Sequence, residues 1–393
     1  MTSKGRIYSR DIILILAASF FFMTCPMLVT PLITGFAGTL GAGAAMMGII
    51  GGLMNICSLL CRPFMGNLAD KVRKYNLACW GAIFLIAACV GYVFATDPLT
   101  VVLSRVINGL GFACCSICLS TWLSTLLPRD MIGSGMGLYG AMNALAMAVA
   151  PAVGVSVYQR LGYRAAFVLA TVFALFIMVV IQFIKDKGEP ETPENKRKTF
   201  LPPLKNMKLA EKGVIPIALI VMLFTIPYCI TQSFLVNYVE AKGLAVSVSL
   251  FFPAYAIILM VLRLSLRRLF DKLPFKVFLF AGCLSSGGGI GALAFMENNI
   301  HLLLAAFFMA GGYGIMCSVC QSTAILLAGS GKRGLANGTY YIGLDLGLGL
   351  GPVIGGLLLG SVGVRWLYPV MLITLPAELA VYFFSGLRKA ENV

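Results

Sequence analysis

The sequence predicts an all-α protein that crosses a membrane twelve times, in two pseudo-symmetric bundles of six helices. Its composition, its twelve apolar segments and an internal repeat support this fold class. Apolar residues make up 59% of the chain and charged residues only 11%, whereas soluble domains carry about 25% charged residues. We therefore expect the lipid bilayer, and not water, to surround most of the chain.

Twelve apolar segments are long enough for a spanning helix, which needs roughly 20 mostly apolar residues. They lie near residues 11–33, 43–62, 77–95, 99–122, 133–157, 165–184, 213–236, 245–264, 275–295, 300–322, 336–360 and 366–386. The longest polar stretch, rich in proline and charge, separates the sixth segment from the seventh. We expect an N-terminal bundle over 1–184, a cytoplasmic linker over 185–212 and a C-terminal bundle over 213–393.

Positive charge is concentrated in alternate loops. With the N-terminus inside, 25 of the 30 lysines and arginines would lie in cytoplasmic segments and 4 in outside loops. This bias follows the positive-inside rule and predicts that both termini are cytoplasmic. We expect a multi-pass protein of a prokaryotic cytoplasmic membrane. Because the bias accounts for the net charge of +15, we expect no nucleic-acid partner.

The two halves are related by a single offset of 201 residues, which aligns landmarks from the start to the end of each half. The aligned pairs are Pro26 with Pro227, Arg62 with Arg263, Asp70 with Asp271, Gly137 with Gly338, Pro151 with Pro352, Gly154 with Gly355, Gly162 with Gly363 and Arg164 with Arg365. Six spans per half give both halves the same topology. The repeat is therefore parallel, about an axis along the membrane normal.

Three short motifs lie in or beside the spans. The loop after the second span carries Gly66-Asn67-Leu68-Ala69-Asp70-Lys71, which fits the pattern G-x-L-A-D-R/K. The fourth span carries Arg105, Gly109 and Gly111 in an RxxxGxG element. The eleventh span matches the pattern G-x8-G-x3-G-P-x2-G-G at Gly338, Gly347, Gly351, Pro352, Gly355 and Gly356.

Together these motifs resemble those of the major facilitator superfamily. The resemblance covers essentially the whole chain and implies the major facilitator fold. The glycine-proline pattern, when it stands in the fifth span, is associated with proton-driven exporters, so the chain looks most like the twelve-span drug:proton antiporters. In this chain the fifth-span copy is degenerate, although Pro151 and Gly154 remain. Arg73 also replaces a family glycine, and the first span lacks the acidic residue that many such exporters carry.

Gating is the role that the resemblance implies for the loop acids and the glycine-rich helices. In the family, the loop acid contacts the start of a helix in the other half and latches one state, and an aspartate at a helix N-terminus contributes about 0.3–1 kcal/mol. The alternatives are a solvated loop and a merely well-packed helix. The gating and helix-packing candidates are Arg62, Gly66, Asp70, Lys71, Gly109, Pro151, Gly154, Asp271, Gly347, Gly351, Pro352 and Gly355.

Three ionisable residues fall within spans, where they are costly and therefore functional candidates. Asp345 is the first choice for proton coupling, because it lies about 200° around its helix from Gly343 and Gly347 and because removal from water favours a neutral carboxyl. Arg105 keeps its charge and could only exchange partners. Glu378 lies on the twelfth helix, which is peripheral in the family. The alternative for all three is a structural polar contact.

Substrate-binding candidates are polar or aromatic residues on the spans that the family uses to line its pathway. They are Asn108, Asn143, Tyr228, Gln232, Tyr255, Tyr313, Tyr341 and Asp345. One acid among tyrosines would suit lipophilic, cationic ligands through cation–π and dispersion contacts. The alternative is that each aromatic residue serves only packing.

The function that we expect is secondary active transport of a small organic molecule by alternating access, as proton-coupled export. No GxxxxGK[ST] loop occurs, so ATP is not the expected energy source. The alternative within transport is proton-coupled import of a nutrient or organic anion; a non-transporting membrane scaffold or receptor, or a channel, is the alternative outside it. We expect no enzymatic activity, no cofactor, no metal and a monomer.

Overall fold

A computed structural model describes residues 9–191 and 208–387. The middle of the predicted linker and the two chain ends lie outside the described residues. Within them, every regular element is a helix, and twelve helices are long and apolar enough to cross a membrane. The predicted fold class and the number of spans are thereby confirmed. The first span starts at Arg10 and the last ends at Phe384.

Two compact units make up the chain. Unit 1 comprises residues 1–131, 142–210 and 329–338, and unit 2 comprises 132–141, 211–328 and 339–393. Each unit thus contains about ten residues from the other half of the sequence. These segments hold the starts of two helices that occupy corresponding places in the repeat, the fifth and the eleventh spans.

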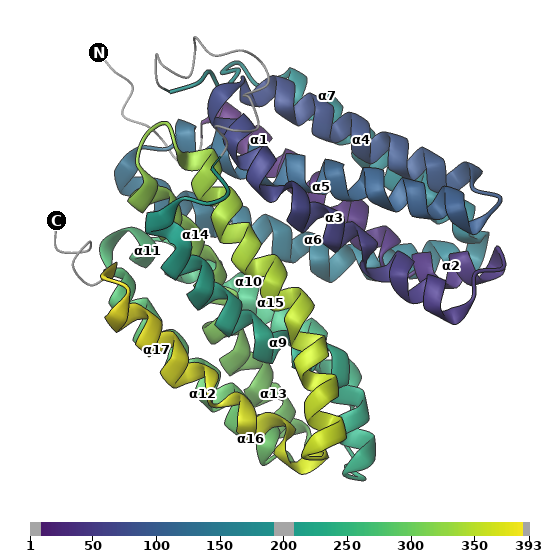
Figure 1. Cartoon of the computed structure of the whole chain (residues 1–393), viewed down its shortest axis with the longest axis vertical. Helices are drawn as coiled ribbons and strands as arrows, with labels where there is room; N and C mark the ends of the chain where they lie inside the picture. The colour runs from purple at the N-terminus through teal and green to yellow at the C-terminus, as the bar shows by residue number, and fades with distance from the viewer. Residues whose placement is uncertain (1–8, 192–207, 388–393) are drawn as a thin grey trace. The chain divides into compact units, whose positions relative to one another are not determined.

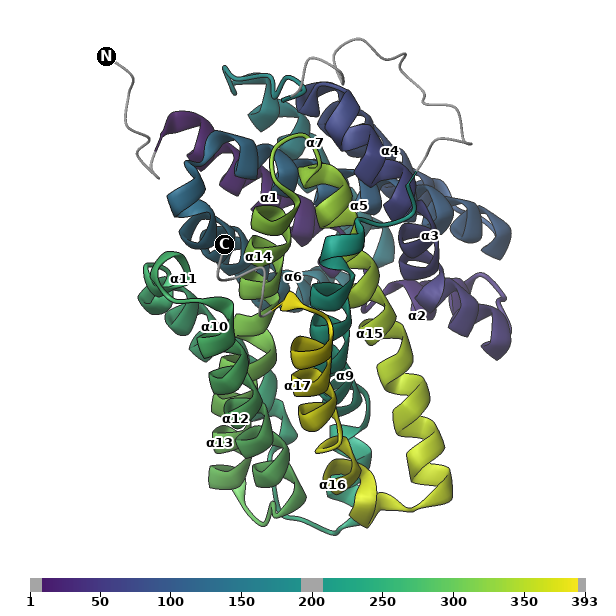
Figure 2. The same ribbon diagram turned by 60° about the vertical axis from the view of Figure 1, so that its left-hand side comes forward.

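The helices of the first half lie side by side in both ribbon views (Figures 1 and 2). They are α1 (Arg10–Val29), α2 (Ile33–Thr39), α3 (Ala44–Lys71), α4 (Lys74–Phe94), α5 (Pro98–Leu126), α6 (Ile132–Leu161) and α7 (Tyr163–Gln182). In unit 1, α5 packs against α1, α3 and α4, while α7 packs against α1 and α4. Small residues on α5 permit this central position, because a Cβ on Gly109 would lie 2.7 Å from the Met54 carbonyl oxygen of α3.

The second half repeats the pattern with more interruptions (Figure 2). Its helices are α9 (Ile215–Ala241), α10 (Phe251–Leu266), α11 (Leu269–Lys272), α12 (Phe275–Ala294), α13 (Asn299–Met309), η5 (Ala310–Gly314), α14 (Ile315–Ala328), α15 (Arg333–Ser361), α16 (Leu367–Met371) and α17 (Thr374–Phe384). The element η5 is one turn of π-helix that joins α13 to α14 within the tenth span. Such π-bulges are frequent at functional sites.

The repeat is visible in the backbone as well as in the sequence. The turns after the fifth and eleventh spans are made by Gly162 and Gly363, with φ of +86° and +78°. Residues with a Cβ rarely adopt this left-handed conformation. The 201-residue offset therefore relates turns with the same backbone geometry and not only similar residue types.

Candidate functional site

The Asp70 carboxylate caps the start of α15. Its two oxygens accept the backbone N–H groups of Gly334 at 2.7 Å and of Leu335 at 3.0 Å, and the side chain is only 8% exposed. All three residues belong to unit 1. The first N–H groups of a helix lack partners within it, and an anion there also interacts favourably with the helix dipole. We call this arrangement the Asp70 clasp.

Unit 2 contains the equivalent arrangement, the Asp271 clasp. The Asp271 carboxylate accepts the backbone N–H of Ser134 at 2.9 Å and also the Ser134 hydroxyl, which in turn contacts the Arg267 carbonyl oxygen at 2.9 Å. Ser134 stands at the start of α6. The residue 201 positions before Leu335 is Ser134. The two aspartates of the repeat, Asp70 and Asp271, therefore cap the starts of α15 and α6, which occupy corresponding places in the two halves.

Glycine permits close approach in both clasps. A Cβ on Gly334 would lie 2.6 Å from the Gly66 carbonyl oxygen, and a Cβ on Gly66 would lie 3.0 Å from the Gly334 carbonyl oxygen. In unit 2, a Cβ on Gly133, the repeat mate of Gly334, would lie 2.5 Å from the Phe270 carbonyl oxygen. The backbone at each helix start therefore contacts the backbone beside the aspartate. Lys71 ends α3 one residue after Asp70.

Two of the 25 basic residues placed at the cytoplasmic side, Arg62 and Arg263, are buried among helices and do not lie in solvated loops. Arg62 is not exposed at all and donates to the Ser116 hydroxyl of α5. Arg263, its repeat mate, is 7% exposed and donates to the carbonyl oxygens of Gly140 and, at 2.8 Å, of Gly314. Their guanidinium groups reach into the helices because an arginine stem extends the charge several ångströms from the backbone.

The glycine face of α15 packs against α9, as its four-residue spacing predicts. A Cβ on Gly347 would lie 2.8 Å from the Met222 carbonyl oxygen, and one on Gly351 would lie 2.6 Å from the Cys229 Cβ. Further along, a Cβ on Gly355 would lie 2.6 Å from the Phe234 ring. Pro352 lies within this helix. In the first half, Pro151 lies within α6, and a Cβ on Gly154 would lie 2.6 Å from the Leu28 carbonyl oxygen of α1.

Asp345 lies near the middle of α15 and is 9% exposed. Because Gly347 and Gly351 face α9, the Asp345 side chain leaves the helix on another side. One turn earlier, the Tyr341 hydroxyl accepts a hydrogen bond from the Gln321 amide of α14 at 3.2 Å. The acid therefore belongs to a polar face of the eleventh span that also bonds to the tenth.

Three of the predicted binding tyrosines form one cluster in unit 2, which we call the tyrosine cluster. Tyr228 of α9 stacks on Tyr313 of η5 with ring centroids 4.3 Å apart, and it contacts the tilted ring of Tyr255 of α10 with centroids 5.1 Å apart. The seventh, eighth and tenth spans thus converge on it. Aromatic pairs at these separations contribute about 0.5–1.5 kcal/mol beyond burial. The π-helical turn places Tyr313 in the cluster.

Arg105 is held by backbone groups of α3. Its guanidinium donates to the carbonyl oxygens of Ile50 at 3.0 Å and of Gly51 at 3.1 Å, and it is 1% exposed. These contacts favour the anchoring alternative over an exchange of partners. One turn further along α5, Asn108 is completely buried, and neither atom of its amide has a hydrogen-bond partner among the described residues.

The remaining predicted residues are scattered. Asn143 of α6 accepts a weak hydrogen bond from Ser19 of α1 at 3.5 Å, within unit 1. Gln232 lies one turn beyond Tyr228 and is exposed. Glu378 of α17 is fully buried and accepts a hydrogen bond from the Cys283 thiol of α12 at 3.2 Å. These three residues do not join the tyrosine cluster.

The linker contributes a contact that sequence reasoning missed. Glu191 accepts the backbone N–H of Gly331 at 2.7 Å and lies 3.4 Å from the Arg333 guanidinium, just before the Asp70 clasp. Upstream, the Gly188 carbonyl oxygen accepts the Lys74 N–H at 2.9 Å. A charged, proline-rich stretch predicts a solvated tether, and nothing in its composition indicates these partners. Gln321 was missed too, although a polar residue within an apolar span was its signal.

No group of three or more potential metal ligands occurs among the described residues. The arrangement as a whole offers two capped helix starts, a glycine face that lets α15 approach α9, and an acid and a tyrosine cluster on neighbouring spans.

Comparisons with known proteins all point to one family of transporters. The family model of the Major Facilitator Superfamily matches residues 13–330. An uncharacterised MFS-type transporter of Methanocaldococcus jannaschii is 22% identical over 86% of this chain and 89% of its own length. A multi-drug resistance efflux pump PmrA homologue of Lactococcus lactis is 23% identical over 43% of each chain. The solved structure of the transporter FucP covers 98% of this chain with a TM-score of 0.73 at 14% identity.

The motifs, the twelve spans, the repeat and the matched family model agree. The chain is a multi-pass membrane protein that belongs to the Major Facilitator Superfamily of transporters.

Proposed function

We propose that this transporter exports a small organic molecule in exchange for protons. The observation that carries the proposal is Asp345, a carboxyl group that is 9% exposed near the middle of a spanning helix. An acid within the membrane is energetically costly and is therefore a functional candidate. A carboxyl can also take up and release a proton, whereas an arginine cannot.

Export is favoured by the kind of relative that the chain resembles. The partial match to the Lactococcus lactis efflux pump supports this direction. The tyrosine cluster provides aromatic faces suited to lipophilic cations. Arg105 would be the natural partner of an organic anion, but its guanidinium is occupied by two carbonyl oxygens. Anion import is therefore the less favoured direction and substrate class.

The two clasps fit a gating role. Both aspartates hold helix starts by hydrogen bonds to backbone N–H groups, each of which contributes about 1.5–3 kcal/mol when the acceptor is charged. This is enough to bias an equilibrium between two conformations without locking it. We propose that the clasps hold the helix starts together on the cytoplasmic side of the membrane, in the orientation that the basic loops predict.

Proteoliposomes distinguish exchange from symport. With an acidic lumen, protons leave the vesicle and an antiporter accumulates a lipophilic cation inside it, whichever way the protein is inserted. A symporter accumulates substrate only when the lumen is alkaline. Uptake driven by an acidic lumen supports the proposal, and uptake driven only by an alkaline lumen overturns it.

A further inference from the structure

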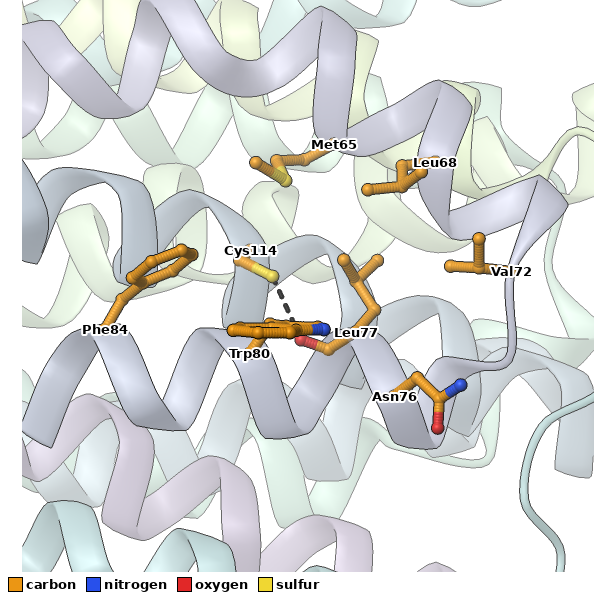
Figure 3. A pocket seen from close by; sticks show the side chains of 8 residues that line it. All are labelled: Met65, Leu68, Val72, Asn76, Leu77, Trp80, Phe84 and Cys114. Carbon is orange, nitrogen blue, oxygen red and sulfur yellow. Dashed lines mark hydrogen bonds between the residues drawn. The ribbon is translucent and has the colours of Figure 1, made fainter. Parts of the chain in front are cut away.

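A groove on unit 1 lies between the second and third spans, at the end of the bundle where α3 stops and α4 begins. It has a volume of about 140 Å³ and is lined by Met65, Leu68, Val72, Asn76, Leu77, Trp80, Phe84 and Cys114 (Figure 3). Met65 and Leu68 project from α3 toward Trp80 and Phe84 of α4. Along α4, positions 76–84 span about 12 Å.

The groove exists because α5 holds its two neighbours by small residues. A Cβ on Gly109 of α5 would lie 2.7 Å from the Cys57 Cβ of α3, and one on Gly111 would lie 3.0 Å from the Gly81 carbonyl oxygen of α4. Each neighbour therefore packs on α5, and the space between them is left open above Cys114. The Cys114 thiol donates to the Leu77 carbonyl oxygen at 3.1 Å (Figure 3), so it presents no unsatisfied donor to an occupant.

The lining predicts an apolar occupant. Every lining side chain except Asn76 is apolar. The groove lies between two helices that are long and apolar enough to span a membrane, so we expect it to face the hydrocarbon of the bilayer. A dry apolar cavity of about 150 Å³ binds a benzene-sized molecule, so a run of several methylenes fits here. Trp80 is 51% exposed beside the groove, as suits an amphipathic ring near a membrane interface.

The end of the groove carries positive charge. Lys71 ends α3, and its ammonium has no ion-pair partner among the described residues, while Arg73 follows two residues later and pairs with Glu189 at 2.6 Å. Lys187 lies over the Tyr75 ring at 4.2 Å, next to Asn76 in the chain. Basic residues at a membrane surface attract anionic lipid headgroups, at about 1 kcal/mol each, or roughly fivefold in affinity.

We propose that this groove binds one acyl chain of an anionic phospholipid, whose headgroup lies against Lys71. The chain lies along α4 between Met65 and Phe84 and covers apolar surface that the second and third spans leave open. The site belongs to unit 1 alone and is independent of the substrate and of the direction of transport.

Fluorescence quenching by brominated lipids tests the proposal at Trp80. The sequence has three tryptophans, so the Trp122→Phe/Trp366→Phe variant leaves Trp80 as the sole reporter. The comparison reporter adds Trp80→Phe and Leu175→Trp. Leu175 is 46% exposed on α7, seven residues before the end of that helix. Tyr75 of α4 bonds to Gln182, the last residue of α7, so both reporters lie at the same end of the unit.

Vesicles of phosphatidylcholine with a small fraction of brominated phosphatidylglycerol are compared with vesicles in which the brominated lipid is phosphatidylcholine. We expect Trp80 to report about fivefold enrichment of the brominated anionic lipid over its bulk fraction, and the Leu175→Trp reporter to report none. Lys71→Ala should remove the enrichment at Trp80. Equal quenching at both positions, no headgroup preference, or no quenching at Trp80 would each overturn the proposal.

Native mass spectrometry of the otherwise unchanged chain gives a second test that does not need the tryptophan replacements. Leu68→Trp fills the groove, whereas Leu60→Trp adds the same bulk at a position on α3 that is 67% exposed. We expect the phosphatidylglycerol adduct to persist in Leu60→Trp and to be lost in Leu68→Trp. An adduct that survives in both variants would place the lipid elsewhere.

Discussion

The backbone N–H of Leu335 donates to the Asp70 carboxylate at 3.0 Å, and the residue 201 positions before Leu335 is Ser134, whose N–H donates to Asp271 at 2.9 Å. The internal repeat therefore extends from residue types to hydrogen bonds. Because each compact unit contains one clasp complete, each can be weakened separately.

Asp70→Asn should lower the stability of the purified protein by about 1.5–3 kcal/mol. An amide has one acceptor oxygen, so one of the N–H groups of Gly334 and Leu335 loses its partner in a buried place, and the charge is lost as well. Thermal unfolding in detergent measures the change. Asp97→Asn is the control, because Asp97 caps α5 through Thr100 at 3.0 Å but is exposed, and water can replace its contacts. Equal shifts for the two variants would contradict a buried clasp.

Gly66→Ala should weaken the Asp70 clasp by steric conflict. The added Cβ would lie 3.0 Å from the Gly334 carbonyl oxygen and 3.1 Å from the Leu335 Cα, and neither backbone atom can move without shifting α15. Gly48→Ala, on the same helix, adds a Cβ with nothing within 4 Å and should gain up to about 1 kcal/mol from helix propensity. We expect opposite signs in thermal stability, and the prediction fails if Gly66→Ala is as stable as Gly48→Ala.

Gly347→Ala should disturb the packing of α15 on α9. Its Cβ would lie 2.6 Å from the Thr225 Cβ, and overpacking of this kind costs about 1–3 kcal/mol. Gly349→Ala is the matched control two residues along the same helix, where a Cβ meets nothing within 4 Å. Transport rate and thermal stability should both fall in Gly347→Ala only. Comparable losses in both variants would mean that helix bending, and not close packing, is what the glycines provide.

Glu378→Gln should leave proton coupling intact. Glu378 is fully buried and bonded to Cys283, and glutamine has nearly the same size and can accept the same hydrogen bond. Glu378→Ala, which leaves a cavity, should destabilise the protein by about 2–5 kcal/mol. Substrate uptake driven by a pH gradient is the measurement. Loss of gradient-driven uptake in the stable Glu378→Gln variant would make Glu378, and not only Asp345, a coupling residue.

The sequence predicted the features that depend on side-chain type and spacing. Twelve apolar segments predicted the spans, and glycines four apart predicted the face of α15 that packs on α9. The offset that pairs Asp70 with Asp271 also pairs Leu335 with Ser134, so the second clasp could have been predicted in full.

The contacts that could not be predicted involve backbone groups and local irregularities. Arg105 is anchored by two carbonyl oxygens of α3, which every sequence supplies at every position. The π-helical turn that carries Tyr313 has no distinct residue signal. Glu191 reaches Arg333 from a linker whose composition indicates only solvation.

Gradient-driven uptake by Asp345→Asn tests the central claim most directly. The variant keeps the size of the side chain and removes its ability to carry a proton. In proteoliposomes with an acidic lumen, wild type should accumulate a lipophilic cation, whereas Asp345→Asn should not, although it should still equilibrate or exchange substrate without a gradient. Unchanged accumulation in Asp345→Asn would contradict the assignment of Asp345 as the proton-coupling residue.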